Sequence, residues 1–153
     1  MKKIIDNYTL VQLLNAFADQ DCFWVSPTKK PHLLISIPVR SALKKNLEVL
    51  REYGNEYSEM LQALQTELQK QFMDAGKATQ NENGVFAVNT GYESDYEKDL
   101  NGKLMDLLQQ KLDVELRSFT TQDLEHYIQL NEKYLTESDV ELLEFFVEDP
   151  KED

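Results

Sequence analysis

Apolar residues recur at helical spacing along much of the chain. An early stripe with i, i+3, i+4, i+7 spacing predicts a helix over residues 8–19, and Asn7 is placed to cap its first turn. The stripe consists of Leu10, Leu13, Leu14 and Phe17.

A second apolar pattern predicts the main element of the chain, a helix over residues 39–75 that Pro38 is suited to open. At 1.5 Å per residue such a helix is ~55 Å long. Its apolar positions alternate between spacings of three and four, which is the heptad seam of helices that pack in pairs. The seam consists of Leu47, Leu50, Gly54, Tyr57, Leu61, Leu64 and Leu68.

Gly54 lies on the seam and allows two interpretations. A glycine inside a helix costs ~1 kcal/mol relative to alanine, so the helix could kink or break there. Alternatively, a partner helix packs closely against the backbone at that position.

The extended segments are short. β-rich runs predict strands or extended pieces at residues 23–25, 33–37, 85–88 and 114–116. Residues 76–84 are polar, lack apolar periodicity and are bracketed by glycines, so they are expected to form an exposed loop.

Three further helices carry capping signatures. Ser94 with Glu97 predicts a capping box for a second long helix, and two S/T-x-x-D motifs, Thr120 with Asp123 and Thr136 with Asp139, predict two short helices near the end of the chain. The final helix is expected to end at Pro150. Its predicted apolar face consists of Val140, Leu143, Phe146 and Val147.

These elements predict an α+β fold that is predominantly helical. Two long helices pair in coiled-coil fashion, beside a small antiparallel sheet and short C-terminal helices. No internal repeat or linker divides the chain, so residues 1–150 are expected to form a single domain and residues 151–153 a frayed acidic tail.

Charge is unevenly placed. Residues 1–75 hold nine Lys/Arg and nine Asp/Glu, whereas residues 76–153 hold seven and nineteen, which accounts for the whole net charge of -12. This acidity argues against direct binding of nucleic acid or of an anionic membrane, because both are polyanions. Cys22 is the only cysteine, and no apolar run has the length of a signal peptide or a membrane span. A cytoplasmic location is therefore expected.

Familiar catalytic and metal-binding patterns are missing from the sequence. The five glycines are scattered and do not form a phosphate-binding loop. Asp123 and His126 are only a fragment of a metal motif, and capping by Asp123 beside a surface histidine explains them better. Cys22 and His32 lack a local catalytic signature, and a buried structural cysteine is the commoner case. We therefore expect no enzymatic activity, no cofactor and no metal.

Basic residues at the start of the long helix form a candidate anion site, made of Arg40, Lys44 and Lys45. Helix N-termini favour negative charge, so three cations there suggest either a solvated basic face or a bound anion.

Acidic residues on the last predicted helix form a candidate interaction face, opposite its apolar stripe. Such a row of carboxylates could imitate a phosphate backbone, or it could be an ordinary solvent-exposed face. The row consists of Glu137, Glu141, Glu144 and Glu148.

Three segments resemble small proteins of unassigned function encoded by tailed phages or prophages of Gram-positive bacteria. They are residues 7–10, residues 35–46 and residues 135–145. The segment through Lys29, Lys30 and Pro31 departs from that pattern. The resemblance implies a viral origin, with the host cytoplasm as location, and it supplies no functional residues.

The sequence favours a non-catalytic protein-interaction module that binds another protein or itself, most simply as a homodimer. The resemblance to phage proteins adds inhibition of a host factor or an accessory role in virion assembly. Two other classes remain open: an acidic nucleic-acid mimic that blocks a DNA- or RNA-binding enzyme, and a binder of small anions at the basic helix start.

Overall fold

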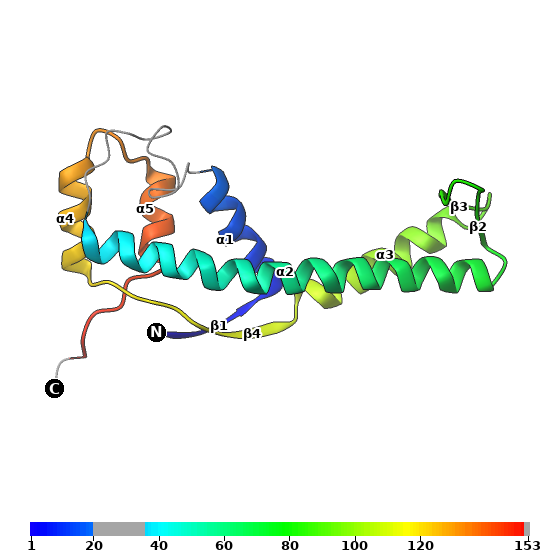
Figure 1. Ribbon diagram of the computed structural model, residues 1–153, viewed down its shortest axis with the longest axis horizontal. Coiled ribbons are helices and arrows are strands. Elements are labelled where there is room, and N and C mark those ends of the chain that lie inside the picture. Colours follow the sequence, from blue (N-terminus) through cyan, green and yellow to red (C-terminus); the bar gives the residue numbers. More distant parts are fainter. Residues whose placement is uncertain (20–35, 152–153) are drawn as a thin grey trace. The chain divides into compact units, whose positions relative to one another are not determined.

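The computed structural model describes residues 1–19 and 36–151, with Asp19 described by its backbone alone. The fold is α+β and mostly helical, as predicted. The elements are, in chain order, β1 (Lys2–Asp6), α1 (Asn7–Asp19), α2 (Ile37–Asp74), β2 (Ala78–Gln80), β3 (Phe86–Val88), α3 (Glu93–Leu108), β4 (Lys111–Glu115), α4 (Thr121–Asn131) and α5 (Glu137–Glu144) (Figure 1).

The chain divides into two compact units. The terminal unit consists of Met1–Gly54 and Lys111–Asp153, and the hairpin unit consists of Asn55–Gln110. Helix α2 contributes residues to both. The single domain expected over residues 1–150 stays a prediction, because two compact units can still unfold together as one cooperative domain. Of the predicted tail, residue 151 is exposed and residues 152–153 lie outside the described part.

The terminal unit is built around an antiparallel pair of strands, β1 and β4. Ile5 and Val114 are buried on one face of the pair, where helices α1, α2 and α5 also contribute to the core. The centres of the Phe17 and Phe146 rings lie 5.9 Å apart there. Among the described residues of this unit, the largest fully buried apolar side chains are Leu10, Phe17, Val39, Leu43, Leu50, Val114, Leu143 and Phe146.

Strand β1 was not predicted, and the strand expected at residues 114–116 begins earlier, as β4 at Lys111. The extended piece predicted at residues 23–25 lies outside the described residues. So does most of the strand predicted at residues 33–37, whose last residue, Ile37, instead begins α2.

The first turn of α1 is capped by Asp6, which corrects the prediction of Asn7. The Asp6 carboxylate accepts a hydrogen bond from the Thr9 backbone N–H at 2.8 Å. This hydrogen bond is the main reason why the pKa of Asp6 lies below its usual value. Asn7 itself is buried at the start of the helix.

Helix α2 matches the predicted long helix closely and continues through Gly54 without a break. A Cβ atom added at Gly54 would lie 2.7 Å from a methyl carbon of Leu14 on α1. The glycine therefore permits close packing of a neighbouring helix, which was the second of its two interpretations.

The hairpin unit consists of the second half of α2, the strands β2 and β3, and α3, which lies along α2 (Figure 1). Its core cluster comprises Leu68, Phe72 and Ala78, with Tyr96 and Leu100 of α3 packed against it. The Phe72 and Tyr96 rings pack edge to face, with their centres 5.1 Å apart. This packing confirms that α2 and α3 associate, and it leaves the coiled-coil geometry a prediction.

Residues 76–84 are more ordered than the predicted loop, because Ala78–Gln80 pairs with Phe86–Val88 as a second antiparallel sheet. Gly76 and Gly84 adopt positive φ angles, which glycine tolerates. Between the strands, the Asn81 side chain accepts hydrogen bonds from the backbone of Asn83 and Val85. These local side chain–backbone bonds shape the turn.

Helix α3 corrects a second predicted cap. It begins at Glu93, so Ser94 lies inside its first turn, and the N-cap residue Tyr92 makes no side-chain capping bond. Glu93 and Asp95 in that turn complement the helix dipole instead.

The two short C-terminal helices are capped as predicted. Both capping boxes are complete, Thr120 with Asp123 at α4 and Thr136 with Asp139 at α5. Helix α5 is shorter than expected and ends at Glu144. After it, the Glu148 N–H donates to the Phe119 carbonyl at 3.0 Å, so the chain there leaves the helical path.

Candidate functional site

A groove between α4 and α5 is the best candidate for an interaction site. It is a hollow of about 540 Å³ in the terminal unit. Three half-buried apolar side chains lie in it, Ile128, Leu135 and Val140, and none of the described residues that line it is a Lys or Arg. Four exposed carboxylates stand around them, those of Glu132, Glu137, Glu141 and Glu144.

The predicted acidic face is therefore only partly a unit. Glu137, Glu141 and Glu144 all belong to α5 and line the groove. Glu148 lies beyond the end of the helix, with its carboxylate 4.0 Å from the Met1 amino group. The regular row of four carboxylates on one helix is wrong, because the chain leaves the helical path between Glu144 and Glu148.

Sequence reasoning missed the α4 side of the groove. Ile128 lies within α4, and Glu132 follows its last residue. Both are ordinary positions for a short amphipathic helix and its end, so neither stands out in the sequence. The available signal was the pair of capping boxes, which predicts two short helices with a brief connection. Such neighbours must pack against each other, but their spacing along the chain does not specify which faces remain open.

The two helices of the groove also approach each other through buried polar side chains. Tyr127 of α4 and Asp139 of α5 are both buried. Burial raises the pKa of the Tyr127 phenol well above its usual value, the Asp139 charge acts in the same direction, and the charge of Arg40 opposes them.

This shift predicts a loss of stability in alkali. Because the folded-state pKa is raised, Tyr127 ionises more readily in the unfolded chain, and the free energy of unfolding should fall as the pH rises above about 10. Urea denaturation between neutral and strongly alkaline pH measures this effect. The Tyr127→Phe variant should lose the extra alkaline slope, whereas parallel curves for the two proteins would contradict the prediction.

The cations of the candidate anion site have the helix position that was predicted. Arg40, Lys44 and Lys45 are all exposed on the first turns of α2, and Lys45 forms an ion pair with Glu48 at 3.7 Å. Of the three, Lys45 lines a hollow of about 480 Å³ beside the β1–β4 sheet. A functional role for the three cations together stays a prediction.

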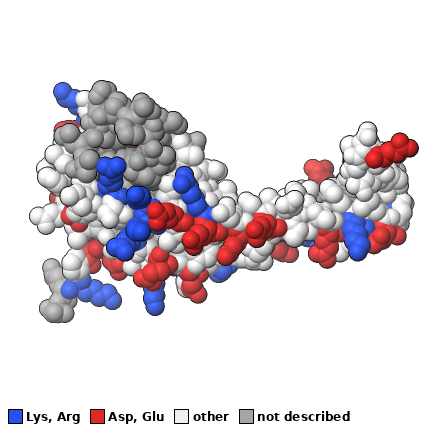
Figure 2. Space-filling model, in the orientation of Figure 1, with Lys and Arg blue, Asp and Glu red and all other residues white. Residues whose placement is uncertain are grey.

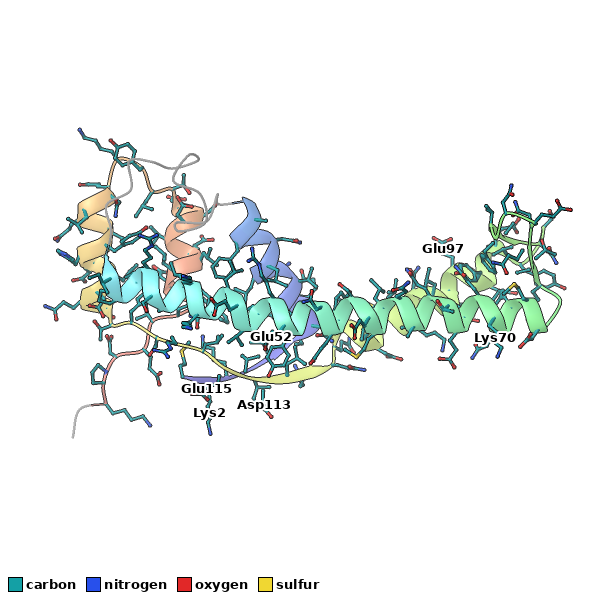
Figure 3. The ribbon with its side chains drawn as sticks, in the orientation of Figure 1. Lys2, Glu52, Lys70, Glu97, Asp113 and Glu115 are labelled. Carbon is teal, nitrogen blue, oxygen red and sulfur yellow. The ribbon has the colours of Figure 1, made fainter. Side chains whose placement is uncertain are left out.

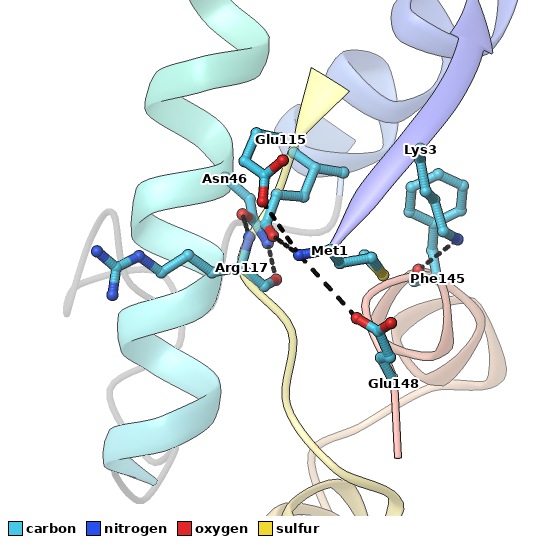
Figure 4. Close-up of polar contacts among 8 residues, drawn as sticks. Met1, Lys3, Asn46, Glu115, Arg117, Phe145 and Glu148 are labelled. Carbon is cyan, nitrogen blue, oxygen red and sulfur yellow. Dashed lines mark hydrogen bonds and ion pairs between the residues drawn. The ribbon is translucent and has the colours of Figure 1, made fainter. Parts of the chain in front are cut away.

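The walls of that second hollow are held by polar contacts (Figure 4). The fully buried Asn46 side chain donates to the Arg117 carbonyl at 2.8 Å and accepts from its N–H at 2.6 Å. The Met1 amino group donates to the Leu116 carbonyl at 2.9 Å and lies 3.5 Å from the Glu115 carboxylate. The Asn46 contact fastens the stretch after β4 to α2, and the Met1 contact fastens the end of β4 and the residue after it to the residue that precedes β1.

Lys3, like the Met1 amino group, is a positively charged group that holds parts of the fold together. Its ammonium group donates to the Phe145 carbonyl at 2.9 Å and lies 3.8 Å from the centre of the Phe145 ring. Partial burial lowers the pKa of Lys3, and the negative charge of Glu148 opposes this shift. Lys3 therefore ties β1 to the end of α5.

The terminal unit combines a basic segment of the chain with an acidic one. Residues 1–54 hold eight Lys/Arg and five Asp/Glu, whereas residues 111–153 hold four and thirteen. Across the β1–β4 sheet, Lys2 faces Glu115 and Asp6 faces Lys111. On the face in Figure 2, basic and acidic side chains accordingly lie close together over this unit.

The side chains of the heptad seam are buried or half-buried within the chain itself. Leu47 and Leu50 are buried in the terminal unit and Leu68 in the hairpin unit, where Tyr57, Leu61 and Leu64 are half-buried. Together with the contact between Gly54 and Leu14, this burial explains the spacing without a second copy. Self-association through the seam stays a prediction.

The remaining candidates from the sequence are Asp123 with His126 and Cys22 with His32. Asp123 completes the capping box of α4 with Thr120, and His126 is exposed. Cys22 and His32 lie outside the described residues. Within the described part, no three His, Cys, Asp or Glu side chains gather to hold a metal ion. Of the helices described, none has the length and apolar character needed to cross a lipid bilayer.

No protein-family model, curated protein or solved structure matches this chain. The resemblance to small phage proteins therefore stays a prediction, and the case for function rests on the geometry of the molecule.

Proposed function

We propose that this protein is a non-catalytic protein-interaction module whose α4–α5 groove binds a basic, amphipathic segment of a partner protein. The observation that carries the proposal is the lining of the groove, whose described residues place apolar side chains among four carboxylates and include no Lys or Arg. A segment with apolar side chains on one face and lysines or arginines beside them complements both parts of this surface.

The two parts of the surface would contribute differently to binding. Exposed ion pairs are worth about 0–1 kcal/mol each, so the carboxylates would mainly speed association and select for basic partners. Most of the affinity would come from apolar side chains that displace water from Ile128, Leu135 and Val140. The complete capping boxes at both helix starts help to preorganise the groove, which lowers the entropic cost of binding.

The biological setting remains the one expected from the sequence. A module of this kind could act in the cytoplasm as an inhibitor of a host factor or as an accessory protein, if the chain is encoded by a phage. Its partner would be a protein, in keeping with the excess of acidic residues.

A synthetic peptide tests the groove directly. The probe has leucines at i, i+3, i+4, i+7 spacing with lysines elsewhere, and it carries a fluorescent label for anisotropy measurements. A second peptide of the same composition, with leucines spread around the helix, should bind more weakly because it lacks an apolar face.

Neutralising the groove should weaken peptide binding. Changing Glu137, Glu141 and Glu144 to Gln together removes three exposed ion pairs of about 0.5 kcal/mol each, or about tenfold in affinity. The matched control changes Glu56, Glu59 and Glu67 to Gln, three exposed residues of α2 outside the groove. Both variants lose the same charge, so equal weakening would show that binding is general electrostatic attraction and would contradict the proposal.

A further inference from the structure

Strand β1 lies at the edge of its two-stranded sheet, and its hydrogen bonds show which backbone groups face outwards. The Leu116 N–H donates to the Met1 carbonyl at 2.8 Å, while the Met1 amino group donates to the Leu116 carbonyl at 2.9 Å. Bonded and non-bonded pairs alternate along an antiparallel ladder. The residues of β1 whose N–H groups point away from β4 are therefore Lys2, Ile4 and Asp6.

A contact on β4 supports this assignment. Asp113 lies opposite Ile4, and its carbonyl accepts a hydrogen bond from the Tyr53 hydroxyl of α2 at 3.0 Å. That carbonyl thus faces away from β1, as the alternation requires. Within residues 1–19 and 36–151, no hydrogen bond reaches the outward backbone groups of Lys2 or Ile4.

The outer face of the sheet carries an apolar side chain among charged ones. Lys2, Asp113 and Glu115 project from the same side of the two strands (Figure 3). Ile4, on the same face, is 72% exposed. An edge strand with free backbone groups and an exposed isoleucine is a template for pairing with another strand.

We infer that β1 pairs with β1 of a second copy about a two-fold axis at Ile4, joining the two sheets into one antiparallel sheet of four strands. Ile4 then lies opposite Ile4 of the other copy, and the two residues exchange both backbone hydrogen bonds. The Lys2 carbonyl accepts a bond from the Asp6 N–H of the other copy. This surface is separate from both the heptad seam and the groove.

Charge complementarity sets this register. Lys2 lies opposite Asp6 of the other copy, and each already lies opposite a residue of opposite charge on β4, Lys2 opposite Glu115 and Asp6 opposite Lys111. Across the four strands the outer row therefore alternates in sign: Glu115, Lys2, then Asp6 and Lys111 of the other copy. Opposite charges on neighbouring strands stabilise a sheet, and like charges destabilise it.

Neighbouring registers lack this match. A shift by two residues places Lys2 or Asp6 opposite Ile4, which breaks both the ion pairs and the apolar contact. The strand is self-complementary only when Ile4 lies on the axis. An isolated two-stranded sheet is marginal in water, so widening it to four strands also stabilises each copy.

The mass of the protein in solution tests this pairing. Light scattering over a wide range of concentrations should show a dimer of the 17.8 kDa chain. Ile4→Lys brings two like charges together on the axis and should weaken the dimer at least about tenfold. The control is Ile37→Lys, the same change at an isoleucine that is 76% exposed at the start of α2, and it should leave the dimer unchanged.

A mixing experiment tests the register itself. Ile4→Lys and Ile4→Glu should each be monomeric, because each places like charges on the axis. Mixed in equal amounts, they should form a heterodimer with opposite charges at that point, detected by native mass spectrometry.

A wild-type protein that stays monomeric, a dimer that Ile4→Lys leaves intact, or a mixture that fails to pair would each overturn the inference. A monomeric wild type would leave the edge available for a strand of a different protein.

Discussion

The Asn46→Asp variant is expected to lose about 3 kcal/mol of the free energy of unfolding at neutral pH, because it places an uncompensated charge in a fully buried position. The Asn46 side chain bonds both backbone groups of Arg117. A carboxylate keeps the bond from the N–H, but it has no proton to donate to the carbonyl and repels that oxygen.

Urea denaturation measures this loss, and Asn55→Asp is the matched control. Asn55 is exposed on the same helix, and its replacement should change stability by only about 0.5 kcal/mol. The deficit at position 46 should shrink in acid, because the buried carboxyl has a raised pKa and regains its proton as the pH falls. A deficit equal to that of the control would show that Asn46 does not hold the stretch after β4.

Elements whose signal is local were predicted well. The length of α2 follows from its apolar repeat, and the starts of α4 and α5 follow from Thr120 with Asp123 and Thr136 with Asp139. A capping box needs only four consecutive residues, so no distant contact has to be known.

Elements that depend on distant partners were missed or misplaced. Strand β1 is five residues long, and its partner β4 lies more than a hundred residues away along the chain. Its adjacent Ile4 and Ile5 also hide the alternation of a strand, because one is exposed and the other buried.

Local signals also failed where two candidates competed. Asp6 and Asn7 are both good capping residues, and the structure uses the one that ends the strand. At the other end of the chain, helical spacing continues from Glu144 to Glu148 although the helix does not.

The candidate site shows the same division. The carboxylates of α5 could be named from the sequence, because their spacing places them on one face of a helix. The apolar side chains between them are contributed partly by α4, so the groove exists only once the two helices pack. The heptad seam was likewise visible, but the sequence could not tell whether its partner belongs to the same chain. Leu50 and Leu68 are buried within the chain, whereas pairing of the seam with a second copy stays a prediction.

The second large effect is expected in the hairpin unit, where Phe72→Ala should cost about 3–4 kcal/mol. Phe72 is 5% exposed and meets the Tyr96 ring at 5.1 Å, inside a cluster that lies wholly within this unit. Removing the ring leaves a cavity that β2, β3 and the start of α3 cannot readily fill. The matched control is Met105→Ala on α3, since Met105 is 55% exposed and should lose little.

Amide hydrogen exchange shows how far this damage spreads. We expect faster exchange in β2, β3 and the first turns of α3, with the β1–β4 ladder unchanged, because a compact unit with its own core can open by itself. Equal acceleration in the β1–β4 ladder would contradict that expectation. It would instead show that both units unfold in one step, as the single domain predicted over residues 1–150 requires.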